Sequence, residues 1–177
     1  MDPAVEHALI ERLKHGDQRA LGVVYQEFSS GVFAYCLKIL ADRQSAEDVV
    51  QDTFLKVRLH VDSLQKNESF KSWIFRIARN EALMQIRKRR QNGQIDDETV
   101  WEEETPHVQL VKSERSEIIN RLLDSLKHEY REVLLLLVYE SMSYAEIATV
   151  TGTTESSVKS RIFRARKAMV ERLEGLV

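Results

Sequence analysis

The last helix that the sequence predicts carries the residues best suited to read DNA. Thr154 can cap this helix, and the face opposite its apolar positions combines hydroxyl, aromatic and cationic side chains. That face and its flanks comprise Ser156, Lys159, Ser160, Arg161, Phe163, Arg164 and Lys167. Serine and arginine can hydrogen-bond base edges, phenylalanine can pack on a thymine methyl group, and lysine and arginine hold phosphates. The pattern predicts recognition of double-stranded DNA, with a solvated basic face as the alternative.

The residues before this helix favour DNA recognition over that alternative. Ser143 and Glu146 have the spacing of a capping box, which opens a short helix that Gly152 ends. A short helix, a tight turn that contains glycine and a basic second helix form a helix-turn-helix. This motif places its second helix in the major groove of DNA.

A second group of basic residues is interleaved with aromatic ones. Residues 70–91 contain seven bases and one acid. The residues among them that could meet nucleic acid are Lys71, Trp73, Arg76, Arg79 and Asn80. Single-stranded nucleic acid binds to aromatic faces beside a cationic track. Aromatic residues are more often part of a core, with arginines that reach past them to solvent, and composition alone favours this core interpretation.

An acidic face lies on the helix predicted from about Ser45 to His60. Residues at helical spacing place an apolar side toward the core, formed by Ala46, Val50, Thr53, Phe54 and Val57. The opposite side carries Asp48, Gln51, Asp52 and Leu55. Such a face is either solvated or docks a partner helix, and the pattern does not choose between the two.

These segments belong to a chain in which every predicted element is a helix. The two prolines, Pro3 and Pro106, leave the residues between them uninterrupted, and no run alternates β-branched with polar residues. Residues 94–104 hold six acids and no base, without helical periodicity. We therefore predict an all-α protein with a helical domain over residues 1–91, an acidic linker over 92–112 and a helix-turn-helix domain over 113–177.

Composition excludes several classes of protein. The longest apolar run, over residues 133–139, is far shorter than the ~18–20 residues that cross a bilayer, so no membrane insertion is expected. A single cysteine, Cys36, excludes an internal disulfide, favours a cytoplasmic location and is interpreted as a packing residue. The five histidines lack metal-ligand spacing, and no phosphate-binding glycine loop or catalytic motif occurs. We expect no enzyme activity, no metal and no cofactor.

In their order along the chain, these segments resemble bacterial RNA polymerase sigma factors of the extracytoplasmic-function (ECF) type. Residues 46–55 resemble the polymerase-docking helix of that family, and residues 70–80 its promoter-melting segment, with 86–90 as a basic continuation. The C-terminal DNA-binding domain of that family has similar segments in this chain, at residues 130–134, 143–148 and 158–166. The resemblance covers roughly residues 17–91 and 113–174.

The resemblance implies a cytoplasmic sigma factor that binds core RNA polymerase and directs promoter recognition, DNA melting and initiation. Polymerase would bind Asp48, Gln51, Asp52 and Leu55. The opened minus-ten element would meet Lys71, Trp73, Arg76, Arg79 and Asn80, with residues 61–69 contributing to a pocket for an unpaired base. The minus-thirty-five element would be read by Ser156, Lys159, Ser160, Arg161, Phe163, Arg164 and Lys167. Core RNA polymerase, promoter DNA and an anti-sigma factor are the partners implied. Two positions depart from the family pattern, Asp52 where Glu is common and Gln85 where Asp is frequent nearby.

A second hypothesis remains open at this point. A stand-alone helix-turn-helix regulator would use the first domain as a sensor or for dimerisation, and it would not bind polymerase. The net charge of −2 fits a polymerase subunit better than an autonomous DNA-binding protein. The acidic linker is either a solvated tether or an RNA mimic in the polymerase channel, with Trp101 as an apolar anchor.

Overall fold

The computed structural model describes residues 2–65, 68–92 and 114–174, and all regular elements within these ranges are helical. The elements are α1 (Pro3–Lys14), α2 (Gln18–Leu40), α3 (Arg43–His60), the 3₁₀ helix η1 (Val61–Ser63), α4 (Phe70–Gln91), α5 (Glu114–Asp124), α6 (His128–Leu134), the π-helical turn η3 (Leu135–Tyr139), α7 (Tyr144–Thr151) and α8 (Glu155–Glu174). The all-α prediction is confirmed. The acidic run over 94–104, with Trp101, lies outside the described residues.

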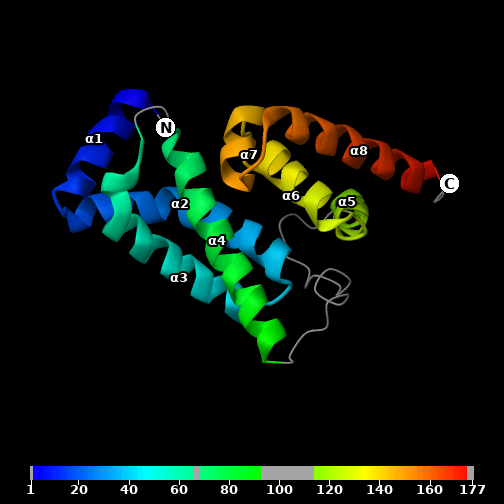
Figure 1. Cartoon of the computed structure of the whole chain (residues 1–177), viewed down its shortest axis with the longest axis horizontal. Coiled ribbons are helices and arrows are strands. Elements are labelled where there is room, and N and C mark those ends of the chain that lie inside the picture. The colour runs from blue at the N-terminus through cyan, green and yellow to red at the C-terminus, as the bar shows by residue number, and fades with distance from the viewer. Residues whose placement is uncertain (1, 66–67, 93–113, 175–177) are drawn as a thin grey trace.

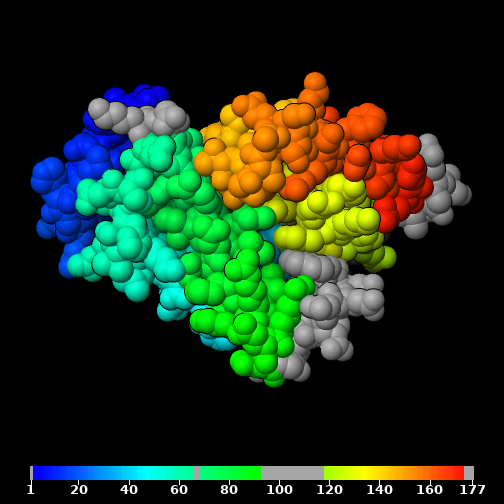
Figure 2. Space-filling model, in the orientation of Figure 1, coloured from blue at the N-terminus to red at the C-terminus, as the bar shows by residue number. Residues whose placement is uncertain are grey.

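The helices form two groups that pack against each other (Figure 1). In the first, here called the N-terminal helices, α2, α3 and α4 pack on one another and α1 crosses one end of α2. In the second, the C-terminal helices α5 to α8, α8 packs on α6 and α7. The contact between α4 and α7 joins the two groups, and Figure 2 shows the C-terminal helices lying against α4.

Local capping explains where the helices begin. Asp17 accepts a hydrogen bond from the backbone N–H of Arg19 at 2.8 Å and begins α2. Ser69 caps α4, and Ser143 with Glu146 forms the complete capping box that begins α7. The start of α7 at Ser143 is the one predicted from the sequence.

The start of α3 was predicted incorrectly. The helix begins at Arg43 rather than near Ser45, because Asp42 is its N-cap and accepts from the N–H of Ser45 at 2.8 Å. The aspartate satisfies free N–H groups of the first turn, so the helix begins before the serine.

A core of aromatic residues joins α2 to α4. Phe28 and Phe70 meet edge to face with ring centroids 5.8 Å apart, and Tyr35 and Phe75 do the same at 5.6 Å. This apolar cluster continues into the C-terminal helices through residues such as Leu136. The two groups therefore share one hydrophobic core.

The apolar run over residues 133–139 is only partly buried. Its first four residues are in the core, whereas Val138 is 64% exposed and Tyr139 is 53% exposed. The backbone widens into the π-helical turn η3 here, which shifts the later side chains out of the α-helical register. Within the described residues, none of the helices combines the length and the apolar composition needed to span a bilayer.

Candidate nucleic-acid interface

The acidic face of α3 is exposed as predicted. Asp48, Gln51 and Asp52 face solvent together with Leu55, whose side chain is 52% exposed. The other side of α3 is buried, and there the hydroxyl of Thr53 donates to the carbonyl oxygen of Val49 at 2.7 Å. The face thus combines two carboxylates with an apolar residue that packing does not use.

Two further residues extend this face, and the sequence analysis missed both. Leu59, one helical turn after Leu55, is exposed, and so is Tyr25 of α2, whose ring centroid lies 4.9 Å from that of Phe54. A shallow pocket between α2 and α3 is lined by Tyr25 and Gln51, among others. The spacing of Leu55 and Leu59 was a signal in the sequence, whereas Tyr25 comes from a different helix.

The residues of α4 predicted to meet DNA divide between two opposite sides of the helix. Trp73, Arg76 and Asn80 line a pocket beside α3, on the side away from the C-terminal helices. Lys71 and Arg79 instead contact the C-terminal helices. The two sides, here called the open face and the covered face of α4, therefore have different surroundings.

The pocket at the open face has a volume of about 500 Å³, within the range of small-ligand sites. It is lined by Lys56, His60, Ser63, Trp73, Arg76, Ile77, Asn80 and Glu81. Lys56 Nζ lies 2.5 Å from Glu81 Oε1, and Arg76 pairs with Glu68 at 3.0 Å. Hydrogen-bonding groups and cations thus surround an apolar wall of Trp73 and Ile77.

Trp73 is a core residue in this structure. Its side chain is 1% exposed and it stacks on Phe70 at a centroid distance of 6.0 Å, while Phe75 is completely buried. The core interpretation of these aromatic residues is confirmed by their burial. A broad ring face for stacking on an unpaired base is absent at Trp73, and a direct DNA contact by this residue stays a prediction.

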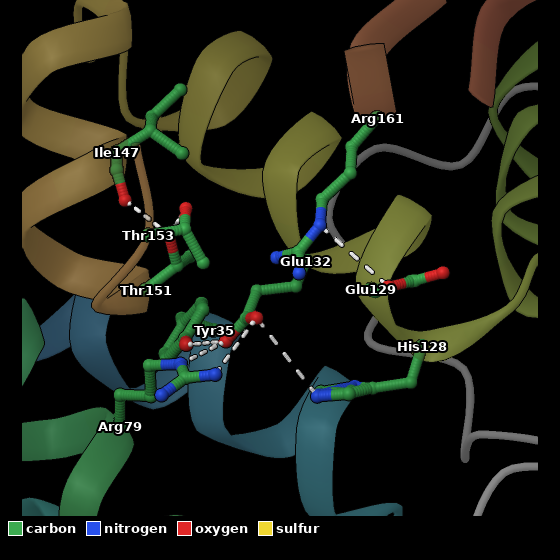
Figure 3. Close-up of polar contacts among 9 residues, drawn as sticks. All are labelled: Tyr35, Arg79, His128, Glu129, Glu132, Ile147, Thr151, Thr153 and Arg161. Atoms are coloured by element: carbon green, nitrogen blue, oxygen red, sulfur yellow. Dashed lines mark hydrogen bonds and ion pairs between the residues drawn. The ribbon is translucent and has the colours of Figure 1, made fainter. Parts of the chain in front are cut away.

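The covered face of α4 meets a buried carboxylate, Glu132 of α6, which is 1% exposed (Figure 3). Arg79 donates to it through Nε at 2.7 Å and through Nη2 at 3.3 Å, and the hydroxyl of Tyr35 donates to the same carboxylate at 2.7 Å. His128 Nε2 lies 4.0 Å from it. A buried charge is stable only when it is paired and hydrogen-bonded, and Glu132 is both.

The electrostatics of this group follow from burial and from the carboxylate. Burial, with the charge of Glu132, raises the pKa of Tyr35 well above its usual value. Burial opposes the charged form of Arg79, but the bonds to Glu132 outweigh it and the pKa of Arg79 is raised. Both side chains are therefore held as hydrogen-bond donors to Glu132.

Two more ion pairs cross between the groups of helices. Lys71 Nζ lies 2.8 Å from Glu140 Oε2 and donates to the carbonyl oxygen of Glu140 at 2.5 Å. Lys38 of α2, which is 8% exposed, pairs with Asp124 at 3.2 Å. The sequence analysis missed Asp124, Glu132 and Glu140. Glu132 gave a signal in the sequence, because it lies one helical turn before Leu136 in an apolar run and so on the same side of the helix.

The face of α8 predicted to read DNA is exposed. Ser156, Lys159, Ser160, Arg164 and Lys167 all face solvent, and Phe163 is 70% exposed. Val158, Ile162 and Ala165 on the other side are buried. Phe163 is therefore accessible to another molecule, beside Ser160 and Arg164 on the same face.

Arg161 differs from the rest of this face. Its Nε lies 3.6 Å from Glu129 Oε2, so it connects α8 to α6 (Figure 3). A polar pocket of about 490 Å³ lies along the same side, lined by Tyr130, Ser156 and Ser160 among others.

Cys36 of α2 is buried as predicted, and burial raises the pKa of its thiol. In the described part of the chain, no group of three or more His, Cys, Asp or Glu residues could hold a metal ion.

Comparison with known proteins agrees with this arrangement. The family model Sigma-70 region 2 matches residues 24–92, which hold most of α2 with α3 and α4, and Sigma-70, region 4 matches residues 116–169. The ECF RNA polymerase sigma factor SigW of Bacillus subtilis is 28% identical over 94% of this chain and 96% of its own. The RNA polymerase sigma-H factor of Pseudomonas aeruginosa is 27% identical over 97% and 95%.

Two solved structures have the same fold. CnrH, in complex with the cytosolic domain of CnrY, superposes with a TM-score of 0.71 at 25% identity, over 95% of this chain and 96% of that one. The sigma factor RpoE of Bartonella quintana, in complex with the anti-sigma factor NepR, gives 0.72 at 28% identity, over 86% and 96%. The two family models together cover more than half of the residues, and the chain belongs to the sigma-70 family of bacterial RNA polymerase sigma factors, in its ECF group.

Proposed function

We propose that this sigma factor directs transcription initiation through three separate surfaces. The acidic face of α3 binds core RNA polymerase, the open face of α4 binds the minus-ten element, and α8 reads the minus-thirty-five element. Sigma factors are initiation factors and not enzymes, as the sequence predicted. A stand-alone regulator is disfavoured because the region 2 match covers the very helices that would be its sensor.

The polymerase assignment is supported by what α3 leaves uncovered. Asp48 and Asp52 are exposed beside an exposed Leu55, and a carboxylate pair around an apolar residue suits a basic partner helix. Leu59 and Tyr25 extend the same surface. We include both residues in the proposed docking site.

The minus-ten assignment is supported by the pocket on the open face of α4. Asn80 and Ser63 can hydrogen-bond a base edge, Ile77 offers an apolar wall, and Arg76 can hold a phosphate. The pocket borders η1, within residues 61–69 that the resemblance assigned to a base pocket. An unpaired base of the opened strand is the ligand that we propose for it.

The minus-thirty-five assignment is supported by the exposed face of α8. Ser160, Phe163 and Arg164 are placed to meet base edges, and Lys159 and Lys167 to meet phosphates. Arg161 is proposed to act mainly by holding α8 on α6, because it already pairs with Glu129.

Partners and location follow from the relatives. The structures of CnrH and of RpoE contain a cytosolic domain of CnrY and the anti-sigma factor NepR, respectively. We propose an anti-sigma partner for this chain too, and a cytoplasmic location, where polymerase and DNA are. The domain limits at residues 1–91 and 113–177, with the linker between them, belong to the same proposal.

The observation that best supports this function is that one chain matches both region 2 and region 4 of the sigma-70 family. The matched helices include α4 and α8, whose exposed faces are the proposed DNA-binding surfaces. Run-off transcription tests it directly, with core RNA polymerase, this chain and fragmented genomic DNA. Discrete transcripts that appear only when the chain is added would support the proposal. A chain that neither binds core polymerase nor yields such transcripts would contradict it.

A further inference from the structure

We propose that region 4 inhibits DNA binding by region 2 in the free protein, by placing acidic side chains against two cations on the covered face of α4. The inference rests on the proposed DNA-binding role of α4. In the closed state Lys71 and Arg79 bind Glu140 and Glu132 instead of DNA phosphates. Opening at this interface is then required before those two cations can contact DNA.

The first argument is the quality of the pairing. Glu132 receives both arms of the Arg79 guanidinium and the hydroxyl of Tyr35, all in a site with almost no solvent. Bidentate arginine pairs are the geometry with which arginine also binds phosphate. The carboxylate of Glu132 therefore occupies the same donors that a DNA phosphate would use.

The second argument is that Lys71 is bound twice by the same residue. Its ammonium group contacts a carboxylate oxygen of Glu140 at 2.8 Å and the backbone oxygen of Glu140 at 2.5 Å. Lys71 also lies over the ring of Phe75, 5.9 Å from its centroid. Lys71 and Arg79 are consequently neutralised by acids in this state. Asn80 on the open face is exposed to solvent.

The third argument comes from α2, which has a glycine where Glu140 approaches. A Cβ atom at Gly31 would lie 2.7 Å from Glu140 Oε1. Glycine in a helix interior is destabilising relative to alanine. Gly22 in the same helix has nothing within 4 Å of the equivalent position. At Gly31 the missing side chain leaves room for the acid that binds Lys71.

These contacts make the interface a two-state element. Opening lets both partners of each buried ion pair be solvated, and such pairs contribute little net stability when they are intact. It also exposes apolar residues that the two groups share, so the open state is the minor one in the free chain. DNA or polymerase that prefers the separated state shifts the population toward it. The apparent affinity of the free chain for DNA is reduced by the fraction of molecules that are open.

The test uses the full chain with dyes on cysteines placed at Gln18 and Val170, two exposed positions on opposite sides of the interface. Native Cys36 is buried and does not compete for dye. The variants are Glu132→Gln with Glu140→Gln, and, separately, Gly31→Leu, which changes no charge. Glu155→Gln with Glu171→Gln is the control for the charge change, and Gly22→Leu is the control for the glycine.

Energy transfer reports the separation of the dyes, and anisotropy reports binding of a short, labelled single-stranded DNA of mixed sequence. We expect both variants to reduce energy transfer and to bind this DNA several-fold to roughly tenfold more tightly than their controls. Unchanged energy transfer in the variants would overturn the inference, and so would separation without tighter binding than in the controls. Circular dichroism confirms folding, and Gly31→Leu keeps the test decisive if the acid variant fails to fold.

A failure of the proposed minus-ten role itself would appear elsewhere. Arg76→Ala alters the open face, which the C-terminal helices do not cover, and it leaves every contact of Glu132 and Glu140 in place. Normal promoter opening by Arg76→Ala would contradict the role of the open face, while energy transfer still measures the interface.

Discussion

Arg131 and Glu132 are adjacent in the sequence, and each binds a different part of the molecule. Arg131 stays within the C-terminal helices, where its guanidinium donates to the carbonyl oxygens of Leu123 at 3.0 Å and Leu126 at 3.4 Å, and to that of Asp124. Glu132 instead binds Tyr35 and Arg79 of the N-terminal helices. One residue thus stabilises region 4, and the next connects it to region 2.

Replacement of Arg131 by alanine is expected to destabilise region 4. The change removes a buried cation from carbonyl oxygens at the end of α5, which then lack a donor. We expect the free energy of unfolding to fall by at least about 2 kcal/mol, measured by urea denaturation. Arg12→Ala, which breaks an exposed pair with Asp17, is the matched control and should have a much smaller effect. Equal stability of the two variants would contradict the role given to Arg131.

Charge reversal on α3 is expected to abolish binding of core RNA polymerase. Asp48→Lys with Asp52→Lys places two cations where a basic partner helix would dock, and because both residues are exposed the fold should persist. The control Glu155→Lys with Glu171→Lys makes the same charge change at exposed positions away from this face. Co-purification measures binding and circular dichroism the fold. Polymerase binding by a natively folded double variant would show that the docking assignment is wrong.

Arg164→Ala is expected to reduce discrimination at one or two positions of the minus-thirty-five element. Each lost base contact should cost about 1–3 kcal/mol in binding free energy. Lys167→Ala, which removes a proposed phosphate contact, should weaken all upstream sequences to the same extent. A panel of promoter variants, assayed with holoenzyme, distinguishes the two patterns. If Arg164→Ala weakens binding to all promoter variants equally, Arg164 contacts the DNA backbone and not a base.

Stability should fall in mild acid because of His128. Burial lowers the pKa of His128 to about 4, whereas the same side chain in the unfolded chain titrates near its ordinary value of about 6.5. Between these values the unfolded state binds a proton that the folded state does not, so unfolding becomes easier as the pH falls.

We expect the free energy of unfolding to be about 2 kcal/mol lower at about pH 5 than at about pH 7.5 from this group alone. His128→Gln should lose this component, and the difference between the two proteins in urea denaturation measures it. The same pH dependence in both proteins would mean that His128 is not the group responsible.

Much of this protein was accessible from the sequence, because helices depend on contacts between residues close in the chain. The caps at Ser143 and Thr154 fall where the sequence placed them, and so do the exposed faces of α3 and α8. Such features depend on side chains within one or two turns of each other, which periodicity and capping rules describe. The family resemblance depended on the same local segments.

The tertiary structure alone decided which acid each basic residue of α4 meets. Lys71, Arg76 and Arg79 look equivalent in the sequence, yet Lys71 and Arg79 bind acids that lie 69 and 53 residues further along the chain, whereas Arg76 pairs with Glu68 just before the helix. It also decided that Trp73 is part of the core and that Gly31 faces Glu140. Local rules do not reach such contacts, because a charge is free or neutralised according to what packs against it, and packing joins segments that are distant in sequence.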